Sequence, residues 1–203
     1  MSSPSQTHAR GGAARQLRII GGAWRGRRLR FPPSPAIRPT PDRVRETLFN
    51  WLTGVIVGAR CLDLFAGSGA LGLEAISRGA LHVTFLEHDP RAVHSIEDCL
   101  RQWDPAGRCS RRVVRADARE FLAGVAEPFD IVFLDPPFAS GLLGPMMARL
   151  EAGGWLRPEA RIYVECAAAD TPSVPPQWNC VRSNRSGQVG YHLYLRQRGI
   201  AVE

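Results

Sequence analysis

An acid, two prolines and an aromatic ring stand together at Asp135, Pro136, Pro137 and Phe138, directly after the apolar stretch 129–134. Five of the six residues in that stretch are apolar or aromatic, which is typical of a strand buried on both faces. Proline has no N–H for a sheet ladder, so strand pairing must end at Pro136. We therefore expect a carboxylate, a backbone carbonyl and a ring at the carboxyl edge of a parallel sheet, where open α/β folds bind ligands. A plain strand that ends in a stiff turn is the alternative.

Three glycines, Gly67, Gly69 and Gly72, follow a predicted strand at 61–65 and open a predicted helix. In this context the G-x-G-x-x-G spacing lets the backbone approach a nucleotide-like ligand closely. Glu87 ends the next predicted strand, 18 residues after Gly69, where an acid can bind ribose hydroxyls. The pattern predicts a ribose-bearing cofactor and leaves its identity open.

Asp63 lies inside the first of these strands, close to the glycine turn. A pyrophosphate there would be repelled by roughly 1–4 kcal/mol per close charge pair, whereas a cofactor with a cationic amine and a sulfonium would be attracted. A purely structural acid is the alternative. Asp117, after the third predicted strand, is placed to accept from an adenine amino group or, alternatively, to cap the next helix.

Strands and helices alternate from residue 60 onward. Repeated βα units predict a mainly parallel sheet with helices on both faces, and the last two strands, joined through 184–187, predict a terminal antiparallel hairpin. The predicted strands are 61–65, 82–87, 111–115, 129–134, 161–166, 178–183 and 189–195, and the predicted helices after the glycine turn are 89–103, 117–122 and 142–150.

A further helix is expected from Thr40-Pro41-Asp42, which offers a capping hydroxyl, a proline at the first position and an acid against the helix dipole. Apolar residues then recur on one face. They are Val44, Leu48, Trp51, Leu52 and Val55.

Positive charge is concentrated at the amino end. All 26 basic residues are arginine. Residues 1–45 hold ten of them against one acid, and the rest of the chain holds 16 against 18 acids, so the net +7 comes from the amino end. This asymmetry indicates a polyanionic partner, most often nucleic acid; a solvated basic tail is the alternative.

The amino end divides into three parts by composition. Residues 1–16 are rich in Ser, Gly, Ala and Arg, and we expect disorder there. An arginine-studded β-hairpin is expected over 17–31, followed by a proline-rich linker to Pro39. Trp24 either stacks on bases or packs the hairpin onto the main domain.

Several classes are disfavoured by composition. No run reaches the roughly 18–20 apolar residues of a membrane helix, and the amino terminus lacks the apolar region of a secretory signal. Five cysteines form no C-x-x-C pair and the histidines are scattered, so we expect reduced thiols, no metal and a cytoplasmic protein.

Taken together, Asp63–Gly69, Glu87, Asp117 and Asp135–Phe138 resemble the four successive motifs of class I S-adenosylmethionine-dependent methyltransferases. The D-P-P-F sequence is similar to the variant that methylates exocyclic amino groups. The stretches 18–27 and 38–50 resemble the RsmD family, which methylates the N2 of a guanine in bacterial small-subunit (16S) ribosomal RNA.

That resemblance spans roughly residues 17–196. It implies a Rossmann-like α/β fold with a seven-stranded sheet and a small basic amino-terminal hairpin, S-adenosyl-L-methionine as cofactor, and ribosomal RNA or the assembling small subunit as partner. The expected division is a tail at 1–16, an RNA-contacting hairpin and linker at 17–39, and a monomeric methyltransferase domain at 40–203.

Carried over residue by residue, the resemblance implies three sets of site residues. The catalytic set is Asp135, Pro136, Pro137 and Phe138. The cofactor-binding set is Asp63, Phe65, Ala66, Gly67, Ser68, Gly69, Glu87, His88, Asp117 and Ala118. The RNA-binding set is Arg18, Trp24, Arg25, Arg27, Arg28, Arg30, Arg38, Thr40 and Arg43.

The chemistry expected of the catalytic set follows from the weak nucleophilicity of guanine N2, whose lone pair is delocalised into the ring. The Asp135 carboxylate and the Pro136 carbonyl can accept the two amino hydrogens and favour a pyramidal nitrogen. Phe138 would stack on the base and fix its approach, and a stacked guanine must first be flipped out at a few kcal/mol.

Other functions remain open at this point. The same chemistry could methylate adenine N6 or a protein glutamine amide, although the glutamine enzymes usually carry asparagine where Asp135 stands. The glycine spacing with Glu87 also fits a nicotinamide-dependent oxidoreductase. A non-catalytic RNA-binding module would leave the D-P-P-F stretch without a purpose.

Overall fold

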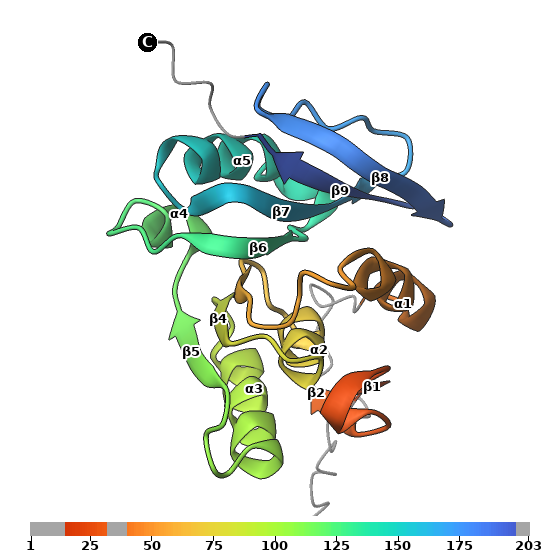
Figure 1. Ribbon diagram of the computed structural model, residues 1–203, viewed down its shortest axis with the longest axis vertical. Helices are drawn as coiled ribbons and strands as arrows, with labels where there is room; N and C mark the ends of the chain where they lie inside the picture. Colours follow the sequence, from red (N-terminus) through yellow and green to blue (C-terminus); the bar gives the residue numbers. More distant parts are fainter. Residues whose placement is uncertain (1–14, 32–39, 198–203) are drawn as a thin grey trace, which may run out of the picture.

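The computed structural model describes residues 15–31 and 40–197. A seven-stranded sheet runs through its centre in the order β5-β4-β3-β6-β7-β9-β8 (Figure 1). Neighbours from β5 to β7 pair in parallel, and β9 pairs antiparallel with β7 and β8. This confirms the predicted parallel sheet with an antiparallel terminal hairpin. The strands are β3 (Arg60–Asp63), β4 (His82–Glu87), β5 (Ser110–Arg115), β6 (Phe129–Leu134), β7 (Leu156–Ala167), β8 (Trp178–Ser186) and β9 (Val189–Arg196).

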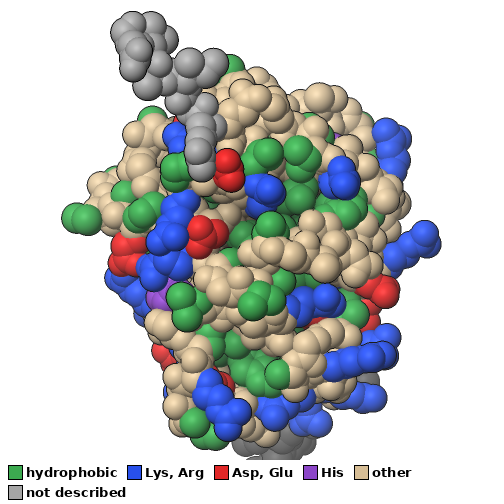
Figure 2. Space-filling view, viewed as in Figure 1, with side chains coloured by type: hydrophobic (Ala, Val, Ile, Leu, Met, Phe, Trp, Pro, Cys, Tyr) green, Lys and Arg blue, Asp and Glu red, His purple; other side chains and the backbone are tan. Residues whose placement is uncertain are grey.

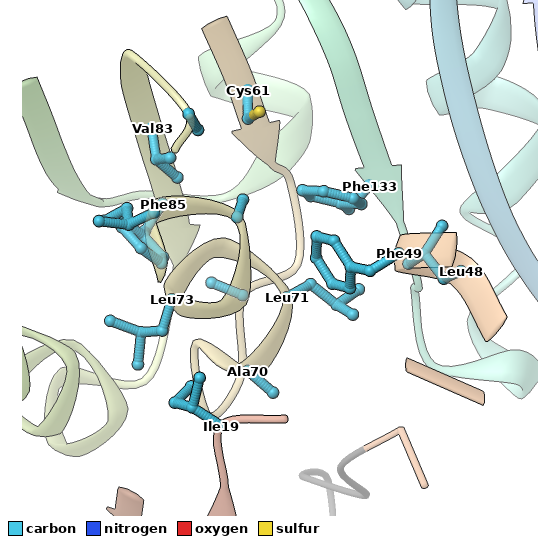
Figure 3. Packing of buried hydrophobic residues seen from close by; sticks show 14 of the residues in the cluster. Ile19, Leu48, Phe49, Cys61, Ala70, Leu71, Leu73, Val83, Phe85 and Phe133 are labelled. Carbon is cyan, nitrogen blue, oxygen red and sulfur yellow. The ribbon is translucent and has the colours of Figure 1, made fainter. Parts of the chain in front are cut away.

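Side chains alternate between two cores along the central strand β6. Ile131 and Phe133 belong to one core and Val132 and Leu134 to the other, as the two-residue repeat of a strand requires. The first core is covered by α1 (Asp42–Trp51), α2 (Ala70–Ser77) and α3 (Pro90–Trp103), and the second by α4 (Ala118–Phe121) and α5 (Leu143–Ala152). Figure 3 shows part of the first core, where Phe49 of α1 points toward Phe133 with ring centroids 5.9 Å apart.

Two helix starts follow the sequence prediction. Asp89 caps α3 by accepting a hydrogen bond from the backbone N–H of Arg91, with Pro90 in the first helical position. Asp117 caps α4 in the same way, through the N–H of Arg119.

The predicted capping role of Thr40 is wrong. Pro41 occupies the cap position of α1 and no side chain caps the helix. The Thr40 hydroxyl instead donates to Glu165 at 2.9 Å, because a buried carboxylate needs a donor more than an exposed helix end does. The predicted apolar face of α1 also stops early, since Leu52 is buried and Val55 is exposed.

A separate two-stranded antiparallel sheet, β1 (Arg15–Arg18) and β2 (Arg28–Phe31), forms the predicted hairpin. Leu17, Leu29 and Phe31 are buried and join the first core, so the hairpin is packed against the domain near α1 and α2 (Figure 1).

Buried polar groups fix this hairpin in place. Glu74 of α2 accepts hydrogen bonds from the backbone N–H groups of Ile20 and Gly21, both at 2.8 Å. The fully buried Arg45 donates to the Arg18 carbonyl at 2.9 Å and pairs with Asp42 at 2.6 Å. This set, called the docking network below, ties the hairpin to α1 and α2.

Neither a membrane span nor a disulfide occurs within the part of the chain that the structure describes. None of its helices combines the length and apolarity needed to cross a bilayer. All five cysteines carry free thiols, as expected.

Candidate active site

The glycine turn links β3 to α2 at the carboxyl edge of the sheet. Gly67 and Gly69 have φ angles of 51° and 78°, in the left-handed region that side chains disfavour. Gly72 meets a different demand, because a Cβ there would lie 2.2 Å from the ring of Phe85 on β4. The first two glycines therefore shape the turn, and the third lets α2 lie close to the sheet.

Glu87 ends β4 beside this turn, as predicted. Its carboxylate accepts from the backbone N–H of Gly67 at 2.7 Å and from those of His88 and Asp89 at 2.8 Å. The side chain is buried and held by backbone donors, so its orientation beside the turn is fixed.

Asp63 ends β3 and is 3 % exposed. Its carboxylate accepts from the N–H of Gly72 at 2.9 Å. Burial raises the pKa of Asp63 to about 7, with a further rise from Glu87, and the bond from Gly72 opposes it. A buried carboxyl with so high a pKa is stabilised in its charged form by a nearby cation.

Asp135 and Glu165 extend this acidic set onto the next two strands. Phe133 pairs with Tyr163 and Leu134 with Val164 in the parallel register of β6 and β7. The same register continued by one residue sets Asp135 beside Glu165, about one strand spacing of roughly 4.8 Å away. Both follow residues of the first core by two positions, so they share the sheet face of Asp63.

Glu165 is 3 % exposed and bound by two hydroxyls. Thr40 Oγ1 donates to its Oε1 at 2.9 Å and the Tyr163 hydroxyl donates to the same oxygen at 2.8 Å. Both donors come from buried residues, so the side chain is held in one orientation.

The electrostatics of the pair disfavour two charges. Burial, then Glu165 and then Asp63, raise the pKa of Asp135 well above its usual range, and a hydrogen bond with Thr40 opposes the rise. Burial also raises the pKa of Glu165, against the bonds from Tyr163 and Thr40. Asp63, Asp135 and Glu165, called the carboxylate cluster below, thus form an acidic site at the ends of three adjacent strands, with Asp63 and Glu165 buried and Asp135 partly exposed.

The rest of the D-P-P-F stretch lies at the rim. Pro136 is buried and Pro137 is exposed, and Phe138 begins the short helix η2 (Phe138–Ser140) with 49 % of its area exposed. The Phe138 ring, three residues after the partly exposed Asp135, is thus open to solvent.

The remaining predicted cofactor residues lie around the same edge. Ala66 and Ser68 are buried in the glycine turn, Phe65 is partly buried before it, and His88 is exposed beside Glu87. Asp117 binds the Arg119 guanidinium at 3.1 Å as well as capping α4. The alternative role of Asp117 as a helix cap is therefore confirmed. Its contact with an adenine remains a prediction, and so does a cofactor contact of the buried Ala118.

Two of the predicted RNA-binding residues, Trp24 and Thr40, are buried, which argues against direct contact of their side chains with RNA. Trp24 is 8 % exposed and packs edge-on against Trp103, with ring centroids 5.6 Å apart. Thr40 is buried against Glu165. In both cases packing with distant residues outweighs what the local sequence suggests.

The other predicted RNA-binding residues that the structure describes are exposed arginines. Arg27 lies over the Trp103 ring at 5.8 Å and Arg18 pairs with Asp42 at 3.1 Å. Figure 2 shows arginines gathered at the lower right of the molecule, over the hairpin and α1. Arg38 lies outside the described residues. The exposed arginines are Arg18, Arg25, Arg27, Arg28, Arg30 and Arg43.

A cavity of about 350 Å³ opens between the hairpin and α1. Arginines line it on the hairpin side and at the end of α2, and Glu46 and Asn50 form the α1 side. This basic cavity has the size of a small-molecule pocket and groups suited to phosphate and base edges. Its arginines are Arg18, Arg25 and Arg78.

Sequence reasoning missed Glu165, Tyr163, Arg45 and Glu74. Glu165 carried a usable signal, because it is an acid near the carboxyl end of an apolar strand, like Asp63 and Asp135. Glu74 also carried one, because it stands within the apolar run 70–76, whereas Arg45 carried none among the charged residues of its helix.

Comparison with known proteins places these features in context. The family model described as "Conserved hypothetical protein 95" matches residues 17–195. Ribosomal RNA small subunit methyltransferase D of Escherichia coli (strain K12) is 52% identical over 183 residues, covering 90% of this chain and 91% of that protein. The protein of the same name from Haemophilus influenzae is 42% identical over 185 residues, covering 88% and 93%. A solved structure of a putative methyltransferase from Escherichia coli matches with a TM-score of 0.80 at 52% identity, covering 90% of this chain and 98% of that one.

Proposed function

The chain belongs to the conserved hypothetical protein 95 family, and from this premise we propose that it transfers a methyl group from S-adenosylmethionine to the N2 amine of a guanine in small-subunit ribosomal RNA. Its relatives are named as methyltransferases of that RNA. The observation that supports the chemistry best is the carboxylate cluster, which contains the first residue of the D-P-P-F stretch and lies beside the glycine turn.

The residues present fit this cofactor. Acids but no basic group are among the causes that shift the pKa values of Asp63, Asp135 and Glu165. A donor that carries a sulfonium and an amine suits such a site, whereas a pyrophosphate would be repelled. Glu87 would hold the ribose hydroxyls, the Gly67–Gly69 turn would pass along the nucleoside, and Asp117 would reach the adenine. The cofactor supplies an electrophilic methyl carbon on a cationic sulfur.

Asp135 and Phe138 supply the two things that a guanine amine needs. The Asp135 carboxylate, together with the Pro136 carbonyl, accepts the amino hydrogens and localises the nitrogen lone pair. The exposed Phe138 ring stacks on the base and sets its angle of approach. Neither proline carries an N–H, so no backbone donor of theirs competes for the acceptors.

The hairpin and the basic cavity are the proposed RNA-contacting surface. Exposed guanidinium groups bind phosphate oxygens bidentately, and each neutralised phosphate steepens the fall of affinity with salt. The basic cavity would take one nucleotide, with its phosphate on Arg25 or Arg78 and its base edge on Glu46 or Asn50.

Incubation with donor labelled in the methyl group tests this proposal. Small-subunit RNA and small subunits that lack the modification are the two substrates, and digestion to nucleosides with mass analysis identifies the product. We expect N2-methylguanosine. Labelled adenosine would assign the alternative target, and absence of label from both substrates would refute the proposed activity.

A further inference from the structure

Asp135 and Glu165 continue the register of adjacent parallel strands at the bottom of the proposed site. Glu165 accepts a hydrogen bond at 2.8 Å from the hydroxyl of Tyr163, which lies on the same strand. Thr40 acts on both, since its hydroxyl donates to Glu165 at 2.9 Å and its side chain opposes the rise in the pKa of Asp135. The Thr40 hydroxyl thus holds Glu165, and the two acids lie side by side at the ends of adjacent strands.

We propose that Asp135 and Glu165 act as one proton-accepting pair, which is fully ionised while the cationic methyl donor is bound and takes up the proton that the methylated amine loses. Thr40 and Tyr163 are positioning residues that hold the pair. This inference rests on the proposed function and adds to it the fate of the proton.

The charge balance of the reaction supports this role. The amine nitrogen forms the N–C bond with its lone pair, the S–C bond breaks onto sulfur, and the positive charge passes from sulfur to nitrogen. An N–H bond of that amine then breaks and its proton moves to Asp135. The reaction leaves a neutral sulfur, a neutral amine and one proton on the pair.

The surroundings of the pair decide how many negative charges it can keep. Facing it are Asp63 from β3, Tyr163 from β7 and, paired with Glu165 in the register of β9, Tyr191. Arg45 lies behind Thr40, bonded to the Thr40 carbonyl at 3.2 Å. With acids as its nearest charged neighbours, the pair keeps two charges only next to a cation, and two carboxyls so placed share one proton without it.

Titration calorimetry tests the inference without turnover. S-adenosylmethionine and S-adenosylhomocysteine, which differ in the charge on sulfur, are each titrated near pH 7 in two buffers of different ionisation enthalpy, which gives the protons released on binding. We expect the wild type to release more protons with the cationic ligand, by up to one proton. In Glu165→Gln one of the causes that raise the pKa of Asp135 is removed while burial and Asp63 remain, so this difference should become clearly smaller while both ligands still bind.

Two further variants separate positioning from general damage. Thr40→Val removes the hydroxyl that donates to Glu165 at nearly constant shape and should change the proton difference, and Thr40→Ser should restore it. Glu97→Gln, on α3 with a side chain that is 42 % exposed, is the matched control and should behave as wild type. Equal proton release for both ligands in the wild type, or an unchanged difference in both Glu165→Gln and Thr40→Val, overturns this inference alone. Failure of the wild type to bind either ligand overturns the proposed function as well.

Discussion

The Thr40 hydroxyl donates to the Glu165 carboxylate at 2.9 Å across 125 positions of the sequence. Thr40 follows the segment that leads from the basic hairpin, and Glu165 lies near the end of β7 beside Asp135. One hydrogen bond thus connects the segment after the proposed RNA-contacting surface to the acid that neighbours the proposed catalytic Asp135. A variant of Thr40 could therefore affect both RNA binding and methyl transfer. Variants that change only the RNA-contacting surface, or only the catalytic residues, are needed to separate the two effects.

Replacing Asp135 by alanine should remove chemistry and spare product binding. Loss of one preorganised acceptor of this kind typically costs about 10²–10³ in turnover. The measurement is the methyl transfer rate on small-subunit RNA, with affinity for S-adenosylhomocysteine determined in parallel. The two should separate, and an equal loss of both would contradict the role given to Asp135.

Asp63→Asn should stabilise the protein without ligand at high pH and weaken binding of the cationic donor. The pKa of Asp63 is raised to about 7 from 3.8, so between those values the folded state binds a proton that the unfolded state lacks. Unfolding free energy then falls as pH rises across this window, by up to about 4 kcal/mol.

Urea unfolding of both proteins from pH 4 to pH 8 measures this effect. The asparagine oxygen can still accept from Gly72, so the variant should lose part of the pH dependence and keep the fold. A wild-type stability that rises across this range, with the same slope in the variant, would contradict the environment described for Asp63.

Gly72→Ala should destabilise the domain, by about 1–3 kcal/mol, because the new Cβ would lie 2.2 Å from the ring of Phe85. Gly144→Ala is the matched control, since it lies in helix α5 with nothing within 4 Å of its Cβ position. That change should stabilise by about 0.5–1 kcal/mol. Chemical denaturation of both variants tests the pair, and a neutral effect at Gly72 would show that α2 can move away from β4.

Arg45→Met should cost about 3–5 kcal/mol, the usual range for removing one partner of a buried ion pair. It leaves Glu74 at the centre of the docking network without its cation from α1, which lies 3.7 Å away. Arg43→Met, exposed on the same helix, is the control and should change stability little. Hydrogen exchange of the hairpin amides shows whether it loosens, and unchanged protection in Arg45→Met would exclude the docking role.

Arg25→Ala should weaken RNA binding and reduce the slope of log affinity against log salt by about 1. Arg25 is exposed and lines the basic cavity. Arg101→Ala, on the outer face of α3, should leave both quantities near wild type. Affinity for S-adenosylhomocysteine should stay unchanged in each variant. An equal loss of RNA affinity in both variants would favour a diffuse effect of charge over specific binding at the basic cavity.

The sequence was sufficient for the sheet, because a parallel strand buried on both faces and a capped helix are local patterns. Phe129–Leu134 and Asp89–Pro90 appear where they were expected. It was insufficient for Thr40, which has every feature of a helix cap yet bonds to a carboxylate from the far end of the chain.

Asp63, Asp135 and Glu87 could be placed near one another from strand ends alone, since adjacent parallel strands end at the same edge. Burial of a charge could not be inferred in this way. Arg45 sits among charged residues of α1 and Glu74 within the apolar helix α2, and the backbone of the packed hairpin supplies hydrogen-bond partners to both.

A crystal structure with S-adenosylhomocysteine bound tests the central claim most directly. We expect the ribose on Glu87, the nucleoside along the Gly67–Gly69 turn, and the sulfur facing Asp135 and the exposed Phe138. A ligand bound elsewhere, or the Asp135 carboxyl turned away from the sulfur, would contradict it.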